Sequence, residues 1–229
     1  MRYMFFTFAF ISSLISYEVE INAISEKGNS LFGEIKTQKD VQIGSSGIVI
    51  KNLQDDFQAI ISYVELVSEN QVRFYPFETL RQVNLPKGLW KPQVGDTIRF
   101  KENYNRAIIL AKNFNSFVKI EKKFDKFWIH SDIFTATLSS IGHKQPLKND
   151  FQYFCQEHSV GLIYIEFQDE VKKVDCLSLK VMEFIPMKFE KSNIQKPFYS
   201  RIKVIDSNMF GDGINEIVDF EKYYRKLIE

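Results

Sequence analysis

The side chains with the greatest chemical potential in this 229-residue chain are two cysteines and three histidines. The histidines are His130, His143 and His158, and no two of them have the spacing that places two ligands on one helix face. The cysteines, Cys155 and Cys176, do not combine with a histidine in a zinc-binding pattern either. The sequence therefore predicts no metal site. We interpret His158, which shares a predicted apolar helix stripe, as a structural residue near a helix end.

A nucleophilic site is the second kind of chemistry to consider. Cys155 and His158 are separated so that one helix turn would bring a thiol beside an imidazole. No third group orients this pair, and no oxyanion hole is recognisable. We therefore predict no catalytic residues and expect that the protein is not an enzyme.

The same two cysteines offer two structural alternatives. A bridge between Cys155 and Cys176 would close a loop of about 20 residues and add roughly 3 kcal/mol to stability. Cys155, however, lies on an apolar helical stripe and Cys176 within an apolar strand pattern. Free cysteine in such positions behaves as a small buried hydrophobe. We favour two unbridged, buried cysteines and keep the disulfide as the alternative, because connectivity does not follow from sequence.

Two loops resemble ligand-binding motifs only in part. Gly44-Ser-Ser-Gly47 lacks the Gly-Lys-Ser/Thr ending of a phosphate-binding loop and does not open a helix, so we expect a turn between strands. The stretch from Asp206 to Asp212 begins like a calcium loop. Its third ligand position is Phe210, and its last is Ile217, where a bidentate glutamate is required. We expect no cofactor.

The charges nearly cancel, at +1 overall. They also cancel locally, because residues 1–115 hold 13 basic and 12 acidic side chains and residues 116–229 hold 17 of each. A nucleic-acid-binding protein needs clustered lysine and arginine to displace counterions from phosphate. The sequence therefore argues against nucleic acid as a partner.

The first sixteen residues have the layout of a secretory signal peptide. Met1-Arg2-Tyr3 is a short basic start, an uncharged apolar run follows up to Ile15, and Ser16 precedes a polar segment. The run is too short to cross about 30 Å of hydrocarbon at 1.5 Å per residue. We predict a signal peptide at 1–16, a mature chain from Tyr17 without a transmembrane helix, and export to the periplasm, outer membrane or cell surface. An uncleaved apolar first strand is the alternative.

The elements that must position these residues fall into two halves, predicted as domains 17–115 and 116–229. The first half is β-rich, and its short runs suggest a small barrel or sandwich. The predicted strands lie at residues 48–50, 59–67, 72–77, 97–101 and 107–111. Hydrophobic residues make up 45% of the chain, so we expect a core that folds without metals or disulfides.

The second half reads as a strand–helix–helix–hairpin unit with a C-terminal helix, which makes the fold class α+β. A strand at residues 126–130 leads into Ser131, a predicted helix N-cap, and Gly142 supplies the C-terminal turn. A second helix follows Pro146. Two strands at residues 162–167 and 171–184 and a helix at 218–228 complete the unit. The two halves pack either as separate domains or as one unit.

Several segments in a fixed order resemble one known family, the N-terminal domain family of plasminogen-binding protein A from Helicobacter- and Campylobacter-type bacteria. The segments that carry this resemblance are Ile43-Gly-Ser-Ser-Gly-Ile-Val49, Leu85-Pro86, Lys91-Pro-Gln-Val-Gly-Asp96, Tyr104-Asn-Arg106, His130-Ser-Asp-Ile-Phe134, Asp150-Phe-Gln-Tyr-Phe-Cys155, Ser159-Val-Gly161 and Pro197-Phe-Tyr-Ser-Arg-Ile202.

The resemblance implies an exported, non-catalytic cell-envelope protein with a protein partner, host plasminogen. Kringle domains of plasminogen recognise a lysine ammonium and a carboxylate held a short distance apart. The last residue here is Glu229, so the resemblance implies an internal lysine, Lys222 or Lys226, beside an acidic side chain of the terminal helix. The alternative function is a periplasmic or outer-membrane scaffold, for example in flagellar or envelope assembly, with no role in plasminogen binding.

Overall fold

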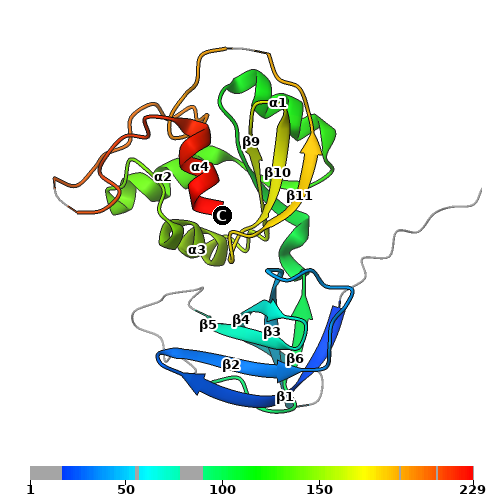
Figure 1. The fold of residues 1–229 in the computed structure, drawn as a ribbon. Coiled ribbons are helices and arrows are strands. Elements are labelled where there is room, and N and C mark those ends of the chain that lie inside the picture. The colour runs from blue at the N-terminus through cyan, green and yellow to red at the C-terminus, as the bar shows by residue number, and fades with distance from the viewer. Residues whose placement is uncertain (1–16, 55–56, 78–89, 191, 210, 229) are drawn as a thin grey trace, which may run out of the picture.

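A computed structural model describes residues 17–54, 57–77, 90–190, 192–209 and 211–228. Figure 1 shows a β-barrel next to a unit of one sheet and its helices. The predicted signal peptide, residues 1–16, lies outside the described residues, as do Leu85, Pro86 and Glu229. No helix among the described residues is both long and apolar enough to cross a membrane.

The predicted barrel is confirmed, and it is closed rather than a sandwich. Its strands follow the order β1-β2-β5-β4-β3-β6, and β6 closes the barrel by pairing with both β1 and β3. The strands are β1 (Tyr17–Lys27), β2 (Ser30–Ile35), β3 (Ser46–Gln54), β4 (Phe57–Ser68), β5 (Gln71–Pro76) and β6 (Thr97–Phe100). The first two strands were not predicted, because their apolar and charged residues alternate without the dense β-branched runs of β3 and β4.

Alternate residues of each barrel strand point inward and fill an apolar core. Val49, Val72, Ile98 and Phe100 in this core are completely buried. Gly33 of β2 is needed here, because a Cβ atom on it would come within 2.7 Å of the Phe74 ring. The barrel is therefore a packed core and not a channel.

The second sheet has five strands in the order β11-β10-β9-β7-β8. They are β7 (Arg106–Leu110), β8 (Phe127–Ile129), β9 (Leu162–Glu166), β10 (Glu170–Asp175) and β11 (Val181–Pro186). The strands β8, β7 and β9 run parallel, whereas β10 is antiparallel to both of its neighbours.

This sheet corrects two predictions about individual strands. The apolar run at residues 107–111, which we grouped with the barrel strands, is β7 and lies inside the second sheet. The predicted strand 171–184 is two strands, because the chain turns back at residues 176–180. The chain leaves the barrel through a short 3-10 helix, η1 (Glu102–Asn105). The division into two folding domains stays a prediction.

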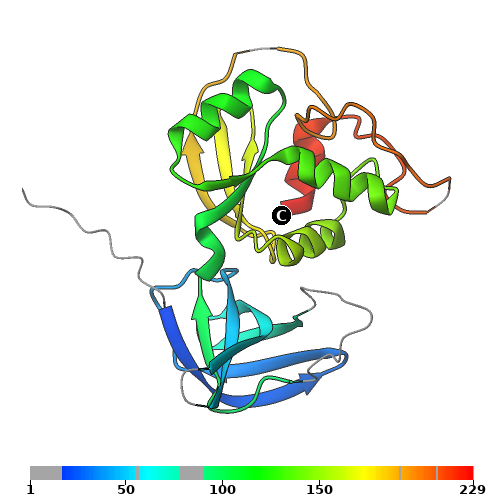
Figure 2. The same cartoon turned by 180° about the vertical axis from the view of Figure 1, so that it is seen from behind.

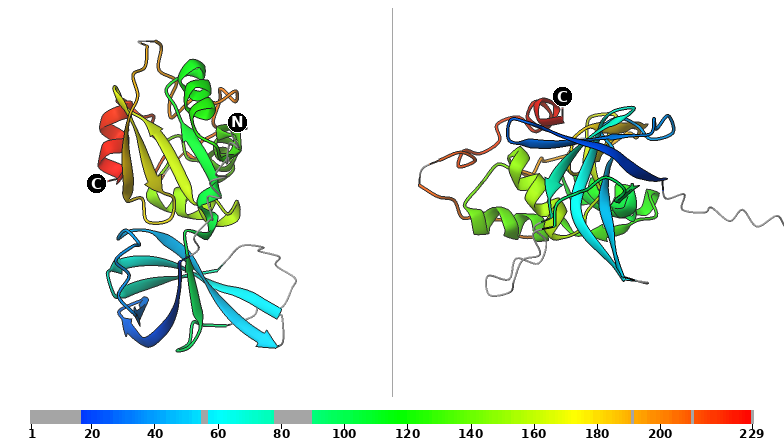
Figure 3. Two further views of the ribbon diagram at one scale, coloured as in Figure 1. Left: turned by 90° about the vertical axis from the view of Figure 1, so that its right-hand side faces the viewer. Right: turned by 90° about the horizontal axis from the view of Figure 1, so that it is seen from below.

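Four helices cover the second sheet on both faces. They are α1 (Phe114–Lys123), α2 (Ser131–Ile141), α3 (Lys148–Glu157) and α4 (Phe220–Ile228). The helix α1 packs on one face through Phe117 and Ile120. The other three helices cover the opposite face (Figures 2 and 3). Their residues Phe134, Phe151 and Phe220 belong to one buried cluster there. The predicted α+β class and the C-terminal helix are confirmed.

Local signals explain the helix ends. Gly142 ends α2 with φ 77°, a conformation that glycine adopts readily. The N-cap of α2 is His130 and not Ser131 as predicted, and its ring nitrogen accepts from the Asp132 N–H at 3.1 Å. The helix α1 was not predicted, although Asn113 caps it by accepting from the Ser116 N–H.

Candidate functional site

Two of the three histidines have structural surroundings. The Nδ1 atom of His143 lies 2.8 Å from the Asp150 carboxylate, which also accepts from the Leu147 N–H at the start of α3. His158 follows the last residue of α3, and its ring packs on Phe154 at 4.7 Å between centroids. Burial lowers the pKa of His158 below its usual value. Its interpretation as a structural helix-end histidine agrees with this position.

The third histidine, His130, belongs to a polar cluster at the carboxyl end of β8. The Asp132 carboxylate accepts from the Ser200 hydroxyl and the Arg201 N–H, both at 2.8 Å, and from the Arg201 guanidinium at 2.5 Å. Burial alone would raise the pKa of Asp132, but these hydrogen bonds outweigh it and hold the pKa below its usual value. The Ser200 hydroxyl donates to Asp132, whereas in a catalytic triad it would donate to a histidine. The cluster fastens the segment around Ser200 to α2.

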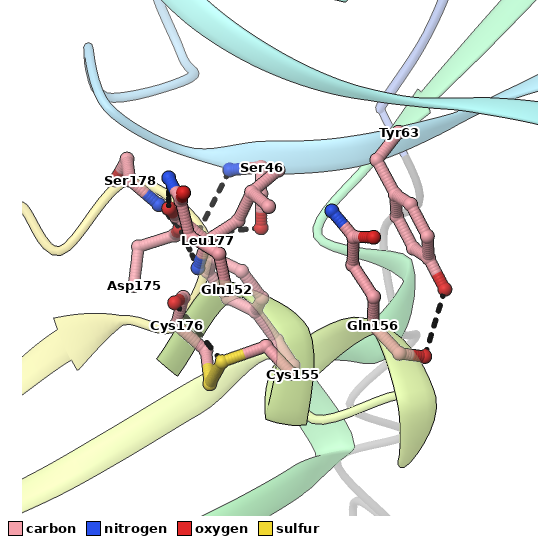
Figure 4. Close-up of a disulfide and its surroundings, with 10 residues drawn as sticks. Ser46, Tyr63, Gln152, Cys155, Gln156, Asp175, Cys176, Leu177 and Ser178 are labelled. Atoms are coloured by element: carbon pink, nitrogen blue, oxygen red, sulfur yellow. Dashed lines mark hydrogen bonds between the residues drawn. A yellow bond between two sulfur atoms is a disulfide. The ribbon is translucent and has the colours of Figure 1, made fainter. Parts of the chain in front are cut away.

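The cysteines form a disulfide, which corrects our preference for free thiols. Cys155 of α3 and Cys176, directly after β10, are bonded with their Cα atoms 5.8 Å apart (Figure 4). Both residues are buried as expected. The apolar surroundings correctly indicated burial, but they did not indicate that α3 packs against the end of β10. The bridge also removes the possibility of a Cys155 thiolate beside His158.

The disulfide borders the junction where the barrel meets the second sheet. The Gly44-Ser-Ser-Gly47 segment reaches this junction: Gly44 lies in a turn, and Ser46 and Gly47 are the first residues of β3, so the segment does not open a helix as a phosphate loop would. Its Ser46 donates two hydrogen bonds to Asp175, from N–H at 2.8 Å and from the hydroxyl at 2.6 Å (Figure 4). The Gly44 carbonyl accepts from the Ser178 hydroxyl at 2.6 Å. This loop therefore fastens the barrel to the turn between β10 and β11.

Asp175 is the centre of the junction. Besides Ser46, it accepts from the Tyr104 hydroxyl at 2.8 Å and from the N–H groups of Leu177 at 3.0 Å and Ser178 at 2.9 Å. Burial raises the pKa of Asp175 above its usual value, and the donors oppose that rise. Its exposed fraction is zero. A carboxylate with five donors has no free acceptor for a ligand, so its role is structural.

Apolar contacts and a close backbone approach complete the junction. Ile48 and Tyr63 of the barrel form one buried cluster with Leu177 of the second unit. A Cβ atom on Gly161 would lie 2.4 Å from the Asn103 carbonyl oxygen of η1. Between the two units is a cavity of about 20 Å³, roughly enough for one water. The junction is too tightly packed to take a larger ligand.

The carboxyl ends of the parallel strands are the usual ligand position in such sheets, at the point where the chain reverses its strand order. Here that point lies between β7 and β9. The Glu166 carboxylate accepts from the Lys112 N–H at 2.7 Å, and the Lys112 ammonium pairs with Glu221 of α4 at 2.5 Å. Burial raises the pKa of Glu166. The C-terminal segment also binds here, since the Tyr199 N–H donates to the Ala111 carbonyl. The chain itself occupies this position.

The predicted partner-binding lysines lie elsewhere, on the outer face of α4. Lys222 and Lys226 are exposed and follow each other one helix turn apart. Asp219 precedes the helix, is exposed, and accepts from the Lys222 N–H at 3.0 Å. No described carboxylate lies within ion-pair distance of either ammonium; the described ion pair of α4 is that of Glu221.

The calcium-like stretch from Asp206 to Asp212 forms a loop against α2, where the Asn208 side chain donates to the Ile141 carbonyl at 3.1 Å. Phe210, within it, lies outside the described residues. Across the part of the chain that the structure describes, no three metal-ligating side chains gather closely enough to hold an ion.

Sequence reasoning missed Asp175, although one signal was present. An acidic residue inside the apolar run Val174-Asp-Cys-Leu177 must find donors if that run is buried. Four of the eight segments that carry the family resemblance meet at this point, since Gly44, Tyr104, Cys155 and Gly161 all line or border the junction.

Comparison with known proteins identifies the family. The chain matches the family described as "Plasminogen-binding protein pgbA N-terminal" over residues 16–228. Two curated relatives, both named plasminogen-binding protein PgbA and found in Helicobacter pylori strains 26695 and J99, are each 28% identical over 200 residues. The match covers 83% of this chain but 43% of each relative, so the chain spans less than half the length of these relatives. No solved structure matches the chain. The predicted resemblance is confirmed: the chain belongs to the family of N-terminal domains of plasminogen-binding protein PgbA.

Proposed function

We propose that this protein is an exported, non-catalytic binding module of the cell envelope that binds plasminogen through lysines of α4. Family membership carries the proposal, because the matched relatives are named for binding plasminogen. The surroundings of the polar clusters support a non-catalytic role. Asp175, Asp132 and Glu166 all hold chain segments together, and each has its acceptors engaged by the protein's own donors.

The geometry of α4 supports Lys222 and Lys226 as the ligands. A kringle domain requires an ammonium and a carboxylate at a short separation, and Asp219 and Lys222 lie three residues apart on one helix face. That spacing corresponds to about 4.5 Å along the helix axis. Lys226 extends the same face by one turn. Exposed ammonium groups without described ion pairs reach a partner without first breaking internal contacts.

Binding of residues 17–229, which contain every described element, to immobilised plasminogen tests this proposal. We expect saturable binding that a soluble lysine analogue abolishes. The double variant Lys222→Ala/Lys226→Ala should weaken binding at least tenfold. The matched control Lys36→Ala/Lys39→Ala removes two exposed lysines of the barrel and should leave it unchanged. Absence of binding, or equal losses in both double variants, would count against the α4 site.

A scaffold role in the envelope is the second candidate. Several large apolar side chains are exposed on the fold, among them Phe57 at 75% and Phe114 at 58%. Exposed aromatic residues favour protein–protein assembly. Binding to an envelope component that is indifferent to the lysine analogue would favour this function over the first.

Export is part of the same proposal and has its own test. Intact mass measurement of the protein from the envelope fraction of cells expressing the whole chain should show loss of residues 1–16. Retention of that segment in the cytoplasmic fraction would contradict export.

A further inference from the structure

The strand β11 forms one edge of the second sheet. Among the described residues, no strand pairs with the outer side of β11. The Gln42 side-chain amide of the barrel donates a hydrogen bond to the Val181 carbonyl of β11 at 3.1 Å. An edge strand presents backbone N–H and C=O groups that another extended chain can pair with. Natural proteins usually shorten an edge strand, cover it or place charged side chains on it. One face of β11 instead carries an exposed aromatic side chain, Phe184.

Phe184, in the middle of β11, has 60% of its surface exposed. It is paired in register with Lys172 of β10, and the two side chains share the sheet face that α4 covers. A phenylalanine of this exposure on an edge strand costs solubility and adds little to the core. It is the kind of residue that anchors a partner at an interface.

Lys172, behind Phe184, is only 4% exposed. Its ammonium lies between two aromatic rings, 4.6 Å from the centroid of Phe167 and 5.2 Å from that of Phe184. The nearest described carboxylate, of Glu170, is 3.9 Å away, and the ammonium has no hydrogen bond to another described residue. The Glu170 carboxylate and the two rings therefore hold this ammonium beneath Phe184.

A second cation stands beside it. The Arg225 guanidinium of α4 lies 5.3 Å from the Phe167 ring centroid, is exposed, and forms no ion pair with a described carboxylate. Phe184 and Arg225 are exposed on this face, and Lys172 lies beneath Phe184. These three residues and the backbone edge of β11 are here called the β11 surface.

We propose that the β11 surface docks an extended, acidic segment of a partner protein, which pairs with β11 as an added strand. The backbone edge supplies hydrogen bonds, Phe184 supplies apolar contact, and the exposed Arg225 guanidinium attracts carboxylates on the facing side of the segment. A second copy of this chain fits less well. A symmetric pairing of β11 with β11 would bring Arg225 of both copies to the same face, cation beside cation.

Two blocked seven-residue peptides test the proposal: one alternating glutamate with valine, and a counterpart with lysine in place of glutamate. Each is titrated into ¹⁵N-labelled residues 17–229. The acidic peptide should bind saturably, with the largest amide shifts at residues 181–186, and the basic peptide at least tenfold more weakly. Phe184→Ser should weaken the acidic peptide at least fivefold, and Arg225→Gln about threefold. Ile133→Ser on α2, a matched loss of a 42% exposed apolar side chain, should have no effect.

Three results would overturn the proposal. Equal affinity for both peptides would show that charge does not select the segment. Shifts confined to other strands, or an unchanged affinity of the Phe184→Ser variant with an unchanged circular dichroism spectrum, would show that β11 is not the docking edge. A dimer in analytical ultracentrifugation that Phe184→Ser dissolves would assign the edge to a second copy.

Discussion

Ser46 and Asp175 meet at 2.6 Å across the boundary between two sheets, although 129 residues separate them in the chain. Ser46 begins β3 of the barrel, and Asp175 ends β10 of the second sheet. Their contact fastens the units through a carboxylate from which solvent is excluded. Because every donor around Asp175 is itself buried or half-buried, loss of the carboxylate leaves several polar groups without partners.

Asp175→Asn should destabilise the protein by about 3 kcal/mol. The NH2 group of the asparagine would face groups that now donate to the carboxylate, and each unsatisfied buried group costs about 1–3 kcal/mol. Urea unfolding at neutral pH measures the change. Asp125→Asn, at an exposed aspartate after α1, is the matched control and should stay within about 0.5 kcal/mol of wild type. Equal midpoints for both variants would show that the junction contact is dispensable.

The disulfide should be present in the purified protein and should contribute about 3 kcal/mol, as expected for a loop closed over 21 residues. Thiol titration of the unfolded, unreduced chain should therefore find no free thiol. The Cys155→Ala/Cys176→Ala variant should unfold at lower urea than wild type, and a reductant should lower the wild-type midpoint while leaving that of the variant unchanged. Two titratable thiols before reduction would refute the bridge.

Glycines at the junction should tolerate no side chain. Gly161→Ala places a Cβ atom 2.4 Å from a backbone oxygen, and Gly47→Ala places one 2.5 Å from the Arg99 oxygen, so both should cost more than 2 kcal/mol. Gly28→Ala is the control, because nothing lies within 4 Å and the cost, about 1 kcal/mol, arises from its φ of 58°. Thermal unfolding compares the three. Equal losses would show that backbone conformation, and not close approach, explains these glycines.

Asp132 should make stability depend on acid pH. Its pKa in the folded protein lies below the usual value, so the folded state favours the ionised form. The corresponding stabilisation is present above the pKa of the unfolded chain, about 4, and is lost as pH falls through the folded pKa. Asp132→Asn should lower stability at pH 7 by about 1 kcal/mol and flatten the decline below about pH 4. An unchanged slope in that range would assign the acid sensitivity to other groups.

Local signals predicted much of the fold. Turn residues and β-branched runs located β4, β5 and β6, and Gly142 located the end of α2, because these features depend on a few neighbouring residues. Membership of a sheet is not local. The apolar run at residues 107–111 correctly predicted a strand, but only the pairing of β7 with β8 and β9 places it in the second sheet.

The candidate sites were harder to predict for the same reason. Burial of Cys155 and Cys176 followed from their apolar neighbours, whereas their bond depends on how α3 packs over the end of β10. Lys222 and Lys226 were named from the family resemblance; the structure shows that they are exposed because Phe220, Tyr224 and Ile228 form the buried side of α4. The β11 surface was not predicted, since Lys172 and Arg225 meet the same ring only after the sheet and the helix have assembled.

The way the barrel closes has a practical consequence for attaching the molecule to a surface. Tyr17 is paired with Phe100, the last barrel residue before η1, and the Lys101 ammonium lies 4.6 Å from the Tyr17 ring centroid. A tag or tether joined ahead of Tyr17 would therefore emerge beside the seam between the two units. Immobilisation through that end would therefore place mechanical load on the junction between the barrel and the second unit. Coupling through an engineered cysteine at Asn29, in the exposed turn between β1 and β2, would avoid this end of the barrel.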